Sequence, residues 1–330
     1  MNQYDFKKGK FTEEKVDIDL SDFDSDKFIT FDKKSHFTFG NGDGKSEYKK
    51  VDNTHIGQLK LLLSELQTLV YYIDTTLTKT ILYIGAHPGN HISILSHLFP
   101  SIKFHLYDIG INWDKRLQEN KNIIIYNKYF DEMDIKKWQQ YDQPLFLISD
   151  IRSLDVKDDP DSFSEREELV WADMKLQQNW VEKIKPETAL LKFKLPYPTE
   201  KENKKYYLDG TVLRQFYARP SSAETRLLIK GISYRDWNLN IYEEMNAYHN
   251  QITRKRLNFF HPLYGNKMPI YLARGMNNDY ESTGFYTIIM DYLKKINTPV
   301  NEANIKQILV YILDNCYPSK KIDIKIEKCI

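Results

Sequence analysis

The sequence of 330 residues contains only two cysteines, Cys316 and Cys329, and no cysteine–histidine cluster at metal-ligand spacing. This scarcity excludes a disulfide framework and predicts no metal site. No apolar run reaches the length of about 18 residues that a membrane span needs. The opening residues, MNQYDFKKGK, lack the apolar segment of a signal peptide. The sequence therefore predicts a soluble, cytoplasmic protein that does not contact a membrane.

The chain also lacks a strong excess of charge of either sign. Its 47 Lys and Arg residues nearly balance its 46 Asp and Glu residues, which leaves a net charge of +1. A protein that coats nucleic acid is far more basic, so any contact with RNA must come from a local patch. Aromatic residues are plentiful, with 23 Tyr and 17 Phe. They suit stacking on bases, and they equally suit a tyrosine-rich core.

No internal repeat and no long Pro- or Gly-rich linker divides the chain. Residues 1–50 mix Asp, Lys and scattered Phe around the turn sequence NGDG, which predicts a partly ordered N-terminal arm. We expect residues 51–330 to form a single domain with a C-terminal helical extension. In that extension, Ile305, Ile308, Leu309 and Ile312 share one face of a helix predicted over 301–315.

Hydrophobic spacing predicts the order of the secondary structure. Leucines at helical spacing indicate an amphipathic helix over 55–73. Short apolar runs predict strands at 80–84, 104–107, 123–126, 145–149, 189–193 and 226–229, and helices are expected at 91–98, 131–139 and 164–184. Strands that are apolar throughout are typical of a parallel sheet covered on both faces. The alternation predicts an α/β fold with a doubly wound, mostly parallel sheet.

The sharpest local motif is ILYIGAHPGNH at 81–91, where a strand leads into Gly85, a Pro88–Gly89 turn and a helix. Glycine lets the backbone approach a ligand closely, and the helix N-terminus adds free N–H groups. The spacing is neither G-x-G-x-x-G nor that of a P-loop, which disfavours a dinucleotide or phosphate cradle. Asp108 ends the next strand, where a carboxylate can accept both hydroxyls of an adenosine ribose. A plain strand–turn–helix with a solvated Asp is the alternative.

At four positions, exposure to solvent does not readily account for a charged side chain: Lys60, Asp150, Lys192 and Glu224. Lys192 lies inside the apolar run ALLKFK, and Asp150 directly follows FLIS at the end of a strand. A ribose hydroxyl is a weak nucleophile and needs a base, and a lysine can serve only when it is neutral. Desolvation and a neighbouring ammonium favour the neutral form, whereas carboxylates oppose it. Taken singly, Lys60 and Glu224 also suit a solvated helix face and a strand edge.

The order Lys–Asp–Lys–Glu resembles the tetrad of RNA ribose 2′-O-methyltransferases. Five blocks are similar, in the same order, to the poxvirus-type cap-specific mRNA 2′-O-methyltransferases: GQLKLLLSEL, YIGAHPGNHI, LISDIRS, LLKFKLPYP and SAETRLL. The similarity runs over about residues 55–250 and implies a Rossmann-like, S-adenosylmethionine-dependent methyltransferase fold. It implies methyl transfer from S-adenosylmethionine to the 2′-hydroxyl of the first transcribed nucleotide of m7G-capped mRNA. In poxviruses such a protein is also the stimulatory subunit of the poly(A) polymerase. The resemblance thus implies a polymerase catalytic subunit as partner, in the host cytoplasm or the virion.

By this resemblance Lys192 is the general base, and Lys60, Asp150 and Glu224 complete the tetrad. The residues implied to hold the methyl donor are Gly85, Pro88, Gly89, Asp108, Phe130 and Ile151. Phe130 and Ile151 would pack on the adenine. The loop departs from the family at His87, where the family has a small residue, and this histidine would alter access to the donor.

The resemblance also implies a slot for the methylated guanine of the cap. Tyr197 matches one of two stacking rings, and Glu243 matches a carboxylate that binds the guanine edge. A core tyrosine is the alternative for Tyr197. The N-terminal arm should supply the second ring, for which the candidates are Phe37, Phe39 and Tyr48. The family's second cap carboxylate falls at Thr199, with Glu200 beside it.

RNA beyond the cap should follow basic and aromatic side chains. One candidate cluster comprises Lys201, Lys204, Lys205, Tyr206 and Tyr207, and another comprises Arg254, Lys255 and Arg256. Both clusters also suit a solvated surface. Arg226 is a candidate for a backbone phosphate, with pairing to a nearby carboxylate as the alternative. Two other functions stay open, namely a non-catalytic RNA clamp for a poly(A) polymerase and the methylation of ribosomal or transfer RNA.

Overall fold

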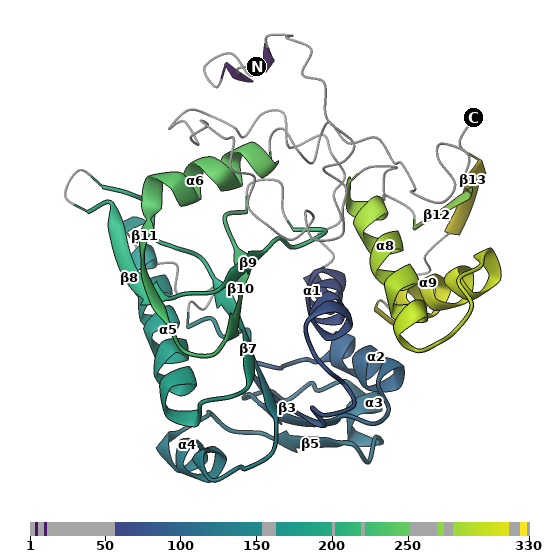
Figure 1. The fold of residues 1–330 in the computed structure, drawn as a ribbon, viewed down its shortest axis with the longest axis horizontal. Helices are drawn as coiled ribbons and strands as arrows, with labels where there is room; N and C mark the ends of the chain where they lie inside the picture. The colour runs from purple at the N-terminus through teal and green to yellow at the C-terminus, as the bar shows by residue number, and fades with distance from the viewer. Residues whose placement is uncertain are drawn as a thin grey trace.

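The computed structural model describes residues 4–5, 10–11, 57–153, 163–199, 202–218, 222–250, 269–273, 280–316 and 324–328. A seven-stranded sheet forms its centre, in the order β5–β4–β3–β6–β7–β10–β9 (Figure 1). The strands are β3 (Thr80–Ile84), β4 (Lys103–Tyr107), β5 (Ile123–Tyr126), β6 (Leu145–Ser149), β7 (Thr188–Phe193), β9 (Thr211–Leu213) and β10 (Thr225–Lys230). Strands β3 to β7 pair in parallel, and β10 runs antiparallel to β7 and β9. The predicted mostly parallel sheet is confirmed.

Helices cover both faces of the sheet, which explains why its central strands are apolar throughout. One face packs against α1 (Gly57–Tyr71), α2 (Asn90–Leu98), α3 (Lys115–Gln118), α8 (Tyr280–Lys295) and α9 (Glu302–Cys316). The other face packs against α4 (Glu132–Gln139), α5 (Phe163–Ile184) and α6 (Leu239–Tyr248). Successive residues of β3 alternate between the two cores, as Tyr83 and Ile84 illustrate.

Three short ribbons complete the described elements. Strand β8 (Lys204–Leu208) pairs with β11 (Tyr234–Asn238) beside α6, on the side of the sheet that carries α5. Strand β1 (Tyr4–Asp5) pairs with β2 (Lys10–Phe11), and β12 (Pro269–Ala273) pairs with β13 (Ile324–Lys328). These ribbons lie outside the central sheet, and the apolar pattern of the sequence did not indicate them.

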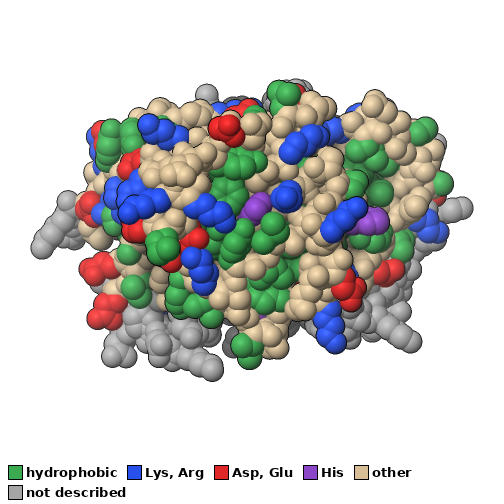
Figure 2. Space-filling view, turned by 90° about the horizontal axis from the view of Figure 1, so that it is seen from below, with side chains coloured by type: hydrophobic (Ala, Val, Ile, Leu, Met, Phe, Trp, Pro, Cys, Tyr) green, Lys and Arg blue, Asp and Glu red, His purple; other side chains and the backbone are tan. Residues whose placement is uncertain are grey.

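The surface drawn in Figure 2 fits the near-neutral charge of the chain. Lysine and arginine side chains are scattered among apolar and uncharged ones on this face and do not merge into one basic field. Among the residues that the structure describes, none of the helices combines the length and the apolar character needed to cross a membrane.

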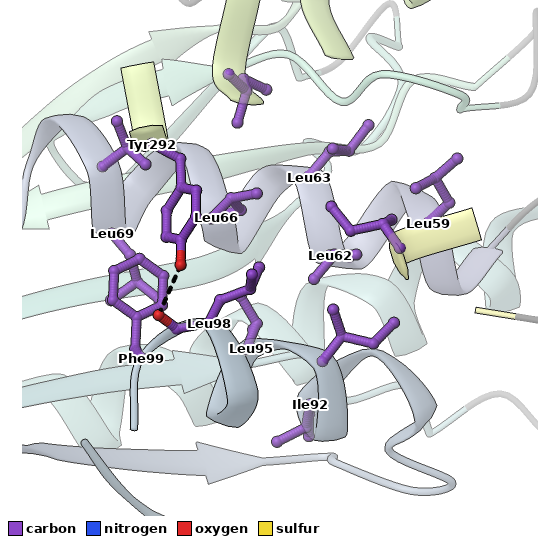
Figure 3. Packing of buried hydrophobic residues seen from close by; sticks show 14 of the residues in the cluster. Leu59, Leu62, Leu63, Leu66, Leu69, Ile92, Leu95, Leu98, Phe99 and Tyr292 are labelled. Carbon is purple, nitrogen blue, oxygen red and sulfur yellow. Dashed lines mark hydrogen bonds between the residues drawn. The ribbon is translucent and has the colours of Figure 1, made fainter. Parts of the chain in front are cut away.

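Helix α1 is the element on which the other helices of its layer converge. Leu62 of α1 lies above α2, which presents Ile92 and Leu95 (Figure 3). Helix α8 covers another side of α1, and its neighbour α9 belongs to the same apolar core. Helices α1, α8 and α9 thus share one core, and the single domain with a C-terminal extension stays a prediction.

The strand order reverses between β3 and β6, and in open α/β sheets ligands bind beyond the carboxyl ends of the strands at such a point. The loops that follow β3, β4, β5 and β6 all emerge at this edge. With β10 inserted antiparallel between β7 and β9, the sheet has the Rossmann-like methyltransferase arrangement that the sequence predicted.

Candidate functional site

The loop after β3 approaches the loop after β6 so closely that only glycine fits. Gly85 has φ +85°, and a Cβ placed there would lie 2.8 Å from the carbonyl carbon of Asp150 and 2.9 Å from the nitrogen of Ile151. Gly89, with φ +79°, directly precedes α2. Both conformations are strained for other residues. The glycines that the sequence singled out therefore let the loop after β3 pack closely on its neighbours at the switch point of the sheet, and we refer to the turn Gly85–Gly89 as the cradle.

Asp108 ties this loop to the one that follows β4. Its Oδ2 accepts a hydrogen bond from the backbone N–H of His87 at 2.9 Å, and its Oδ1 accepts from that of Ile109 at 2.7 Å. The carbonyl of Pro88 accepts from the N–H of Asp114 at 3.0 Å. A carboxylate oxygen has more than one lone pair, so Asp108 can still accept hydrogen bonds from a ligand hydroxyl.

His87 lies against the same loop. Its ring packs edge-on to Trp113, with centroids 5.4 Å apart, and a Cβ on Gly110 would fall 1.9 Å from the ring. The imidazole therefore occupies the space that is open because Gly110, two residues after Asp108, has no side chain. Its Nε2 is buried and has no hydrogen-bond partner among the described residues.

Phe130 and Ile151 complete the predicted donor set at the ends of β5 and β6. Both are half-buried and pack against the apolar core on the α5 side. The Phe130 ring meets Tyr107 edge-to-face at 4.9 Å and Trp180 at 5.5 Å. All six residues predicted to hold the donor thus lie on loops that follow β3 to β6.

The four predicted catalytic residues come together within ion-pair distance, although they are far apart in the sequence. Lys60 of α1 has its Nζ 2.6 Å from Oε1 of Glu224, which precedes β10. Lys192 of β7 has its Nζ 2.9 Å from Oδ1 of Asp150 and 3.8 Å from Oε2 of Glu224. Each of the four side chains is at most 15% exposed. The cluster lies beside the cradle, because Asp150 directly follows β6.

Arg226 belongs to this cluster, which corrects its assignment to an RNA phosphate. It is 1% exposed, and it is the partner of Lys192 in the pairing of β10 with β7. Its Nη2 donates to Oδ1 of Asp150 at 2.6 Å, and its Nη1 donates to the carbonyl of Ser149 at 3.2 Å. A buried guanidinium held in this way cannot reach a phosphate at the surface. The structure instead confirms the alternative, in which Arg226 pairs with a nearby carboxylate, that of Asp150.

Two further residues of the cluster were not predicted. The Nη2 of Arg152 donates to Oε2 of Glu224 at 2.6 Å, and this arginine is 54% exposed. With its amide oriented to suit both neighbours, Gln215 donates to Oε1 of Glu224 at 3.2 Å and accepts from Nε of Arg226 at 2.8 Å. The position of Arg152, two residues after Asp150 at a strand end, was a signal that could have revealed it. Gln215 follows β9 and gives no such signal.

The charges of the cluster keep both carboxylates ionised. Burial would raise the pKa of Asp150, but Arg226, Lys192 and Lys60 outweigh burial and hold this pKa well below its usual range. Burial opposes ionisation of Glu224 in the same way, and the three cations still lower its pKa from 4.5 to about 2. Burial lowers the pKa of Lys60, which Glu224 partly offsets. The cluster contains more cations than anions, since Lys60, Lys192, Arg152 and Arg226 surround Asp150 and Glu224.

The structure describes both predicted cap residues, Tyr197 after β7 and Glu243 on α6. Tyr197 follows β7 and is half-buried, with the Nζ of Lys194 5.1 Å from its ring centroid. Its backbone N–H donates to Oε2 of Glu167 at 3.2 Å. Burial raises the pKa of Tyr197, and the negative charges of Glu167 and Glu243 raise it further.

The predicted RNA residues at the start of β8 differ in what they expose. Lys204 is exposed, and Lys205 has its Nζ 2.6 Å from Oε1 of Glu202. Tyr206 is 59% exposed, whereas Tyr207 is fully buried and donates from its hydroxyl into the core. The inclusion of Tyr207 in an RNA path is therefore wrong, because alternate residues of β8 face opposite sides.

Several predicted positions lie outside the described residues. They are the arm residues Phe37, Phe39 and Tyr48, together with Glu200, Lys201, Arg254, Lys255 and Arg256.

The sheet topology, the glycine cradle after β3 and the lysine–carboxylate cluster define a protein of the Rossmann-like methyltransferase fold. Residues 31–321 match the model of the family described as "Poly A polymerase regulatory subunit". The chain belongs to this family.

Two viral relatives carry the name cap-specific mRNA (nucleoside-2′-O-)-methyltransferase. The protein of fowlpox virus (strain NVSL) is 35% identical over 214 residues, which cover 59% of this chain and 66% of the relative. That of myxoma virus (strain Lausanne) is 34% identical over 220 residues, which cover 62% and 63%, respectively. The matched region thus spans just under two thirds of the length of these curated relatives.

Among solved structures, bluetongue virus VP4, titled as a multifunctional RNA-capping production line, is similar with a TM-score of 0.44 and 17% identity. The match covers 56% of this chain and 30% of VP4. An O-methyltransferase family protein from Burkholderia thailandensis matches with a TM-score of 0.27 and 10% identity, over 44% of this chain and 41% of that chain.

Proposed function

We propose that this protein transfers a methyl group from S-adenosylmethionine to the 2′-hydroxyl of the first transcribed nucleotide of m7G-capped mRNA. The observation that carries the proposal is the convergence of Lys60, Asp150, Lys192 and Glu224 beside the Gly85 cradle. The names of the fowlpox and myxoma relatives support the same activity and substrate. We infer that the enzyme acts in the cytoplasm, as expected from the sequence.

The residues around the cradle fit S-adenosylmethionine. Gly85 lets the loop after β3 pack directly on the backbone of Asp150 and Ile151, which fixes the loop that would hold the donor. Asp108 would accept the ribose hydroxyls with its remaining lone pairs, and the half-buried Phe130 and Ile151 would pack on the adenine. Pro88 and Gly89 would shape the loop around the amino-acid end. When bound, the donor supplies a methyl group that is already activated as a sulfonium.

The lysine–carboxylate cluster would activate and orient the acceptor. Lys192 would accept the proton of the 2′-hydroxyl at its Nζ, which requires the amine to be neutral when RNA is bound. Asp150 would hold Lys192 through its 2.9 Å contact, and Glu224 would hold Lys60. Fixing base and acceptor in this geometry supplies much of the remaining acceleration.

Recognition of the cap would come from Tyr197 and Glu243. The ring of Tyr197 would stack on the positively charged 7-methylguanine, and Glu243 would accept hydrogen bonds from its edge. A second ring from the N-terminal arm would complete the slot. Lys204 and Lys205 would attract the RNA that follows the cap.

The test is methyl transfer from labelled S-adenosylmethionine to short RNAs that begin with m7GpppA or m7GpppG. RNAs with an unmethylated cap or no cap serve as controls, and a Lys192→Ala variant is assayed beside the wild type. We expect label on the first ribose, dependent on the methylated cap and lost in the variant, while the variant still binds the donor. Transfer to ribosomal or transfer RNA that is independent of the cap would replace this proposal.

The family description supports a second role, that of an RNA-clamping subunit for a poly(A) polymerase. Both roles are compatible in one protein, because a clamp needs only the surface and methyl transfer needs the cluster. Tail extension by a poly(A) polymerase catalytic subunit, with and without this chain, tests the second role. Longer tails with the Lys192→Ala variant as well as with wild type would separate the clamp from catalysis.

A further inference from the structure

A buried polar network joins three elements that carry the proposed site. The hydroxyl of Tyr83 on β3 donates to Oε1 of Glu65 on α1 at 2.6 Å. The Nε2 of His91 on α2 lies 3.3 Å from the same carboxylate oxygen and 3.2 Å from the hydroxyl of Tyr83. None of the three residues is more than 2% exposed. They form a carboxylate–imidazole–phenol cluster inside the protein, separate from the lysine–carboxylate cluster.

The His91 ring is held from both of its nitrogens by residues of α1. The backbone N–H of His91 donates to Oε1 of Gln58 at 3.2 Å, which identifies this atom as an acceptor. The Nδ1 of His91 faces the same Oε1 at 2.9 Å, so Nδ1 carries a hydrogen. Its Nε2 faces the Glu65 carboxylate, a second acceptor. The ring is thus fixed between Gln58 and Glu65 of α1, with the hydroxyl of Tyr83 beside it.

The network lies directly behind the proposed donor loop and next to the lysine helix. Gln58 stands two residues before Lys60, and Tyr83 and His91 stand two residues outside either end of the loop Gly85–Gly89. Leucines of α1 pack against α2 along the same interface (Figure 3). A shift of the network would therefore move the loop and the lysine-bearing turn together, because tightly packed elements transmit small displacements.

The charges of the lysine–carboxylate cluster also act on Tyr83 of this network. Burial raises the pKa of Tyr83 well above its usual value, and the charges of Glu65 and Asp150 raise it further, while that of Arg226 lowers it. Tyr83 thus stays a neutral donor.

The network is not arranged for stability alone. Oε2 of Glu65 is buried and has no hydrogen-bond partner among the described residues. A buried polar network with an unsatisfied carboxylate oxygen stabilises a fold poorly compared with apolar side chains of the same size.

We propose that Glu65 and His91 are positioning residues that hold the donor loop in register with the lysine-bearing helix α1, so that donor binding depends on this buried pair. The inference rests on the proposed function, because it assigns a task to the loop as a donor site. Replacing Glu65 by Gln keeps the shape of the side chain and removes its charge. His91 then loses its carboxylate partner, and the loop loses its fixed position relative to Lys60.

The experiment compares donor binding and catalysis in the full-length chain. S-adenosylmethionine is titrated into wild type, Glu65→Gln and Gln67→Leu by calorimetry, and methyl transfer to capped RNA is measured for each. Gln67 is the matched control, because it is a buried polar residue of α1 whose amide has no partner among the described residues. We expect Glu65→Gln to weaken donor affinity and to raise the donor KM roughly tenfold. The KM for capped RNA should be unchanged, and Gln67→Leu should bind the donor like wild type.

A double variant distinguishes positioning from loss of stability. In Glu65→Gln with His91→Gln two neutral amides face each other, so we expect the double variant to recover part of the donor affinity lost in the single one. Equal donor affinity in wild type and Glu65→Gln would overturn the inference. If Glu65→Gln does not fold, Tyr83→Phe removes only one hydroxyl and should weaken donor binding about threefold; unchanged affinity there would overturn the inference as well. Failure of the wild type itself to bind S-adenosylmethionine would instead overturn the proposed function.

Discussion

Replacing Glu224 by Gln removes the carboxylate that holds the cationic cluster together. Glu224 contacts Lys60 and Arg152 at 2.6 Å and Lys192 at 3.8 Å, and its side chain is only 8% exposed. The amide has nearly the same size and leaves no cavity. The substitution therefore isolates the effect of one negative charge, and we expect the variant to be markedly less stable than wild type at neutral pH.

The pKa of Glu224 gives the magnitude. A decrease from 4.5 to about 2 corresponds to about 3 kcal/mol of interaction that favours the ionised, folded form at neutral pH. Removing one partner of a buried ion pair costs a similar amount, about 3–5 kcal/mol. For a domain of this size, a loss of about 3 kcal/mol lowers the midpoint of thermal unfolding by roughly 5–10 °C.

Thermal unfolding followed by circular dichroism measures this difference, with Glu132→Gln as the control. Glu132 pairs with Lys183 at 2.9 Å, but its side chain is 66% exposed, so its loss should cost under about 1 kcal/mol. The stability contributed by Glu224 is complete above pH 4.5, and it is lost as the pH falls through about 2. The difference between the unfolding midpoints of wild type and Glu224→Gln should therefore narrow as the pH falls from 4.5 to about 2. Equal midpoints for the two proteins at pH 7 would refute the argument that the cluster is preformed and tightly coupled.

Other substitutions test the proposed donor and cap sites. Gly85→Ala places a Cβ 2.8 Å from the backbone of Asp150 at positive φ. We expect the free energy of unfolding in denaturant to fall by about 1–3 kcal/mol and donor binding to weaken. A stable variant with normal donor affinity would contradict the proposed role of Gly85. Asp108→Ala should weaken donor binding in calorimetry without unfolding the protein, since its bonds to the loop are at the surface edge; unchanged affinity would remove it from the site. Tyr197→Ala and Glu243→Gln should reduce the preference for m7G-capped over uncapped RNA at least tenfold in competition assays, and an unaltered preference would exclude a cap slot there.

Much of the central fold was predictable from the sequence because local pattern determined it. The strands β3, β5 and β6 have the bounds that their apolar runs predicted. Every residue of β3 and β6 is buried, whereas β5 lies at the edge of the sheet and is only partly buried. The cradle was also predictable, because positive φ and close backbone contact require glycine whatever the rest of the fold is.

Helix α1 shows where pattern alone falls short. Its leucines predicted an amphipathic helix, yet Ser64, Gln67 and Thr68 are buried as well. The reason is that α8 covers another side of α1, where Tyr71 donates to Asp291 at 2.6 Å. A helical pattern reports which face is most apolar, and it carries no information on how many neighbours a helix has.

The candidate site itself divides between sequence and structure. By its own pattern and by resemblance, the sequence determined which residues could bind the donor and take part in methyl transfer. Only the tertiary structure decided that Glu224 meets Lys60 across 164 positions, that Arg226 is buried against Asp150, and that Glu65 pairs with His91. Spacing along a chain fixes the face on which a side chain lies, whereas ion pairs between distant segments depend on which elements become neighbours in the packed fold.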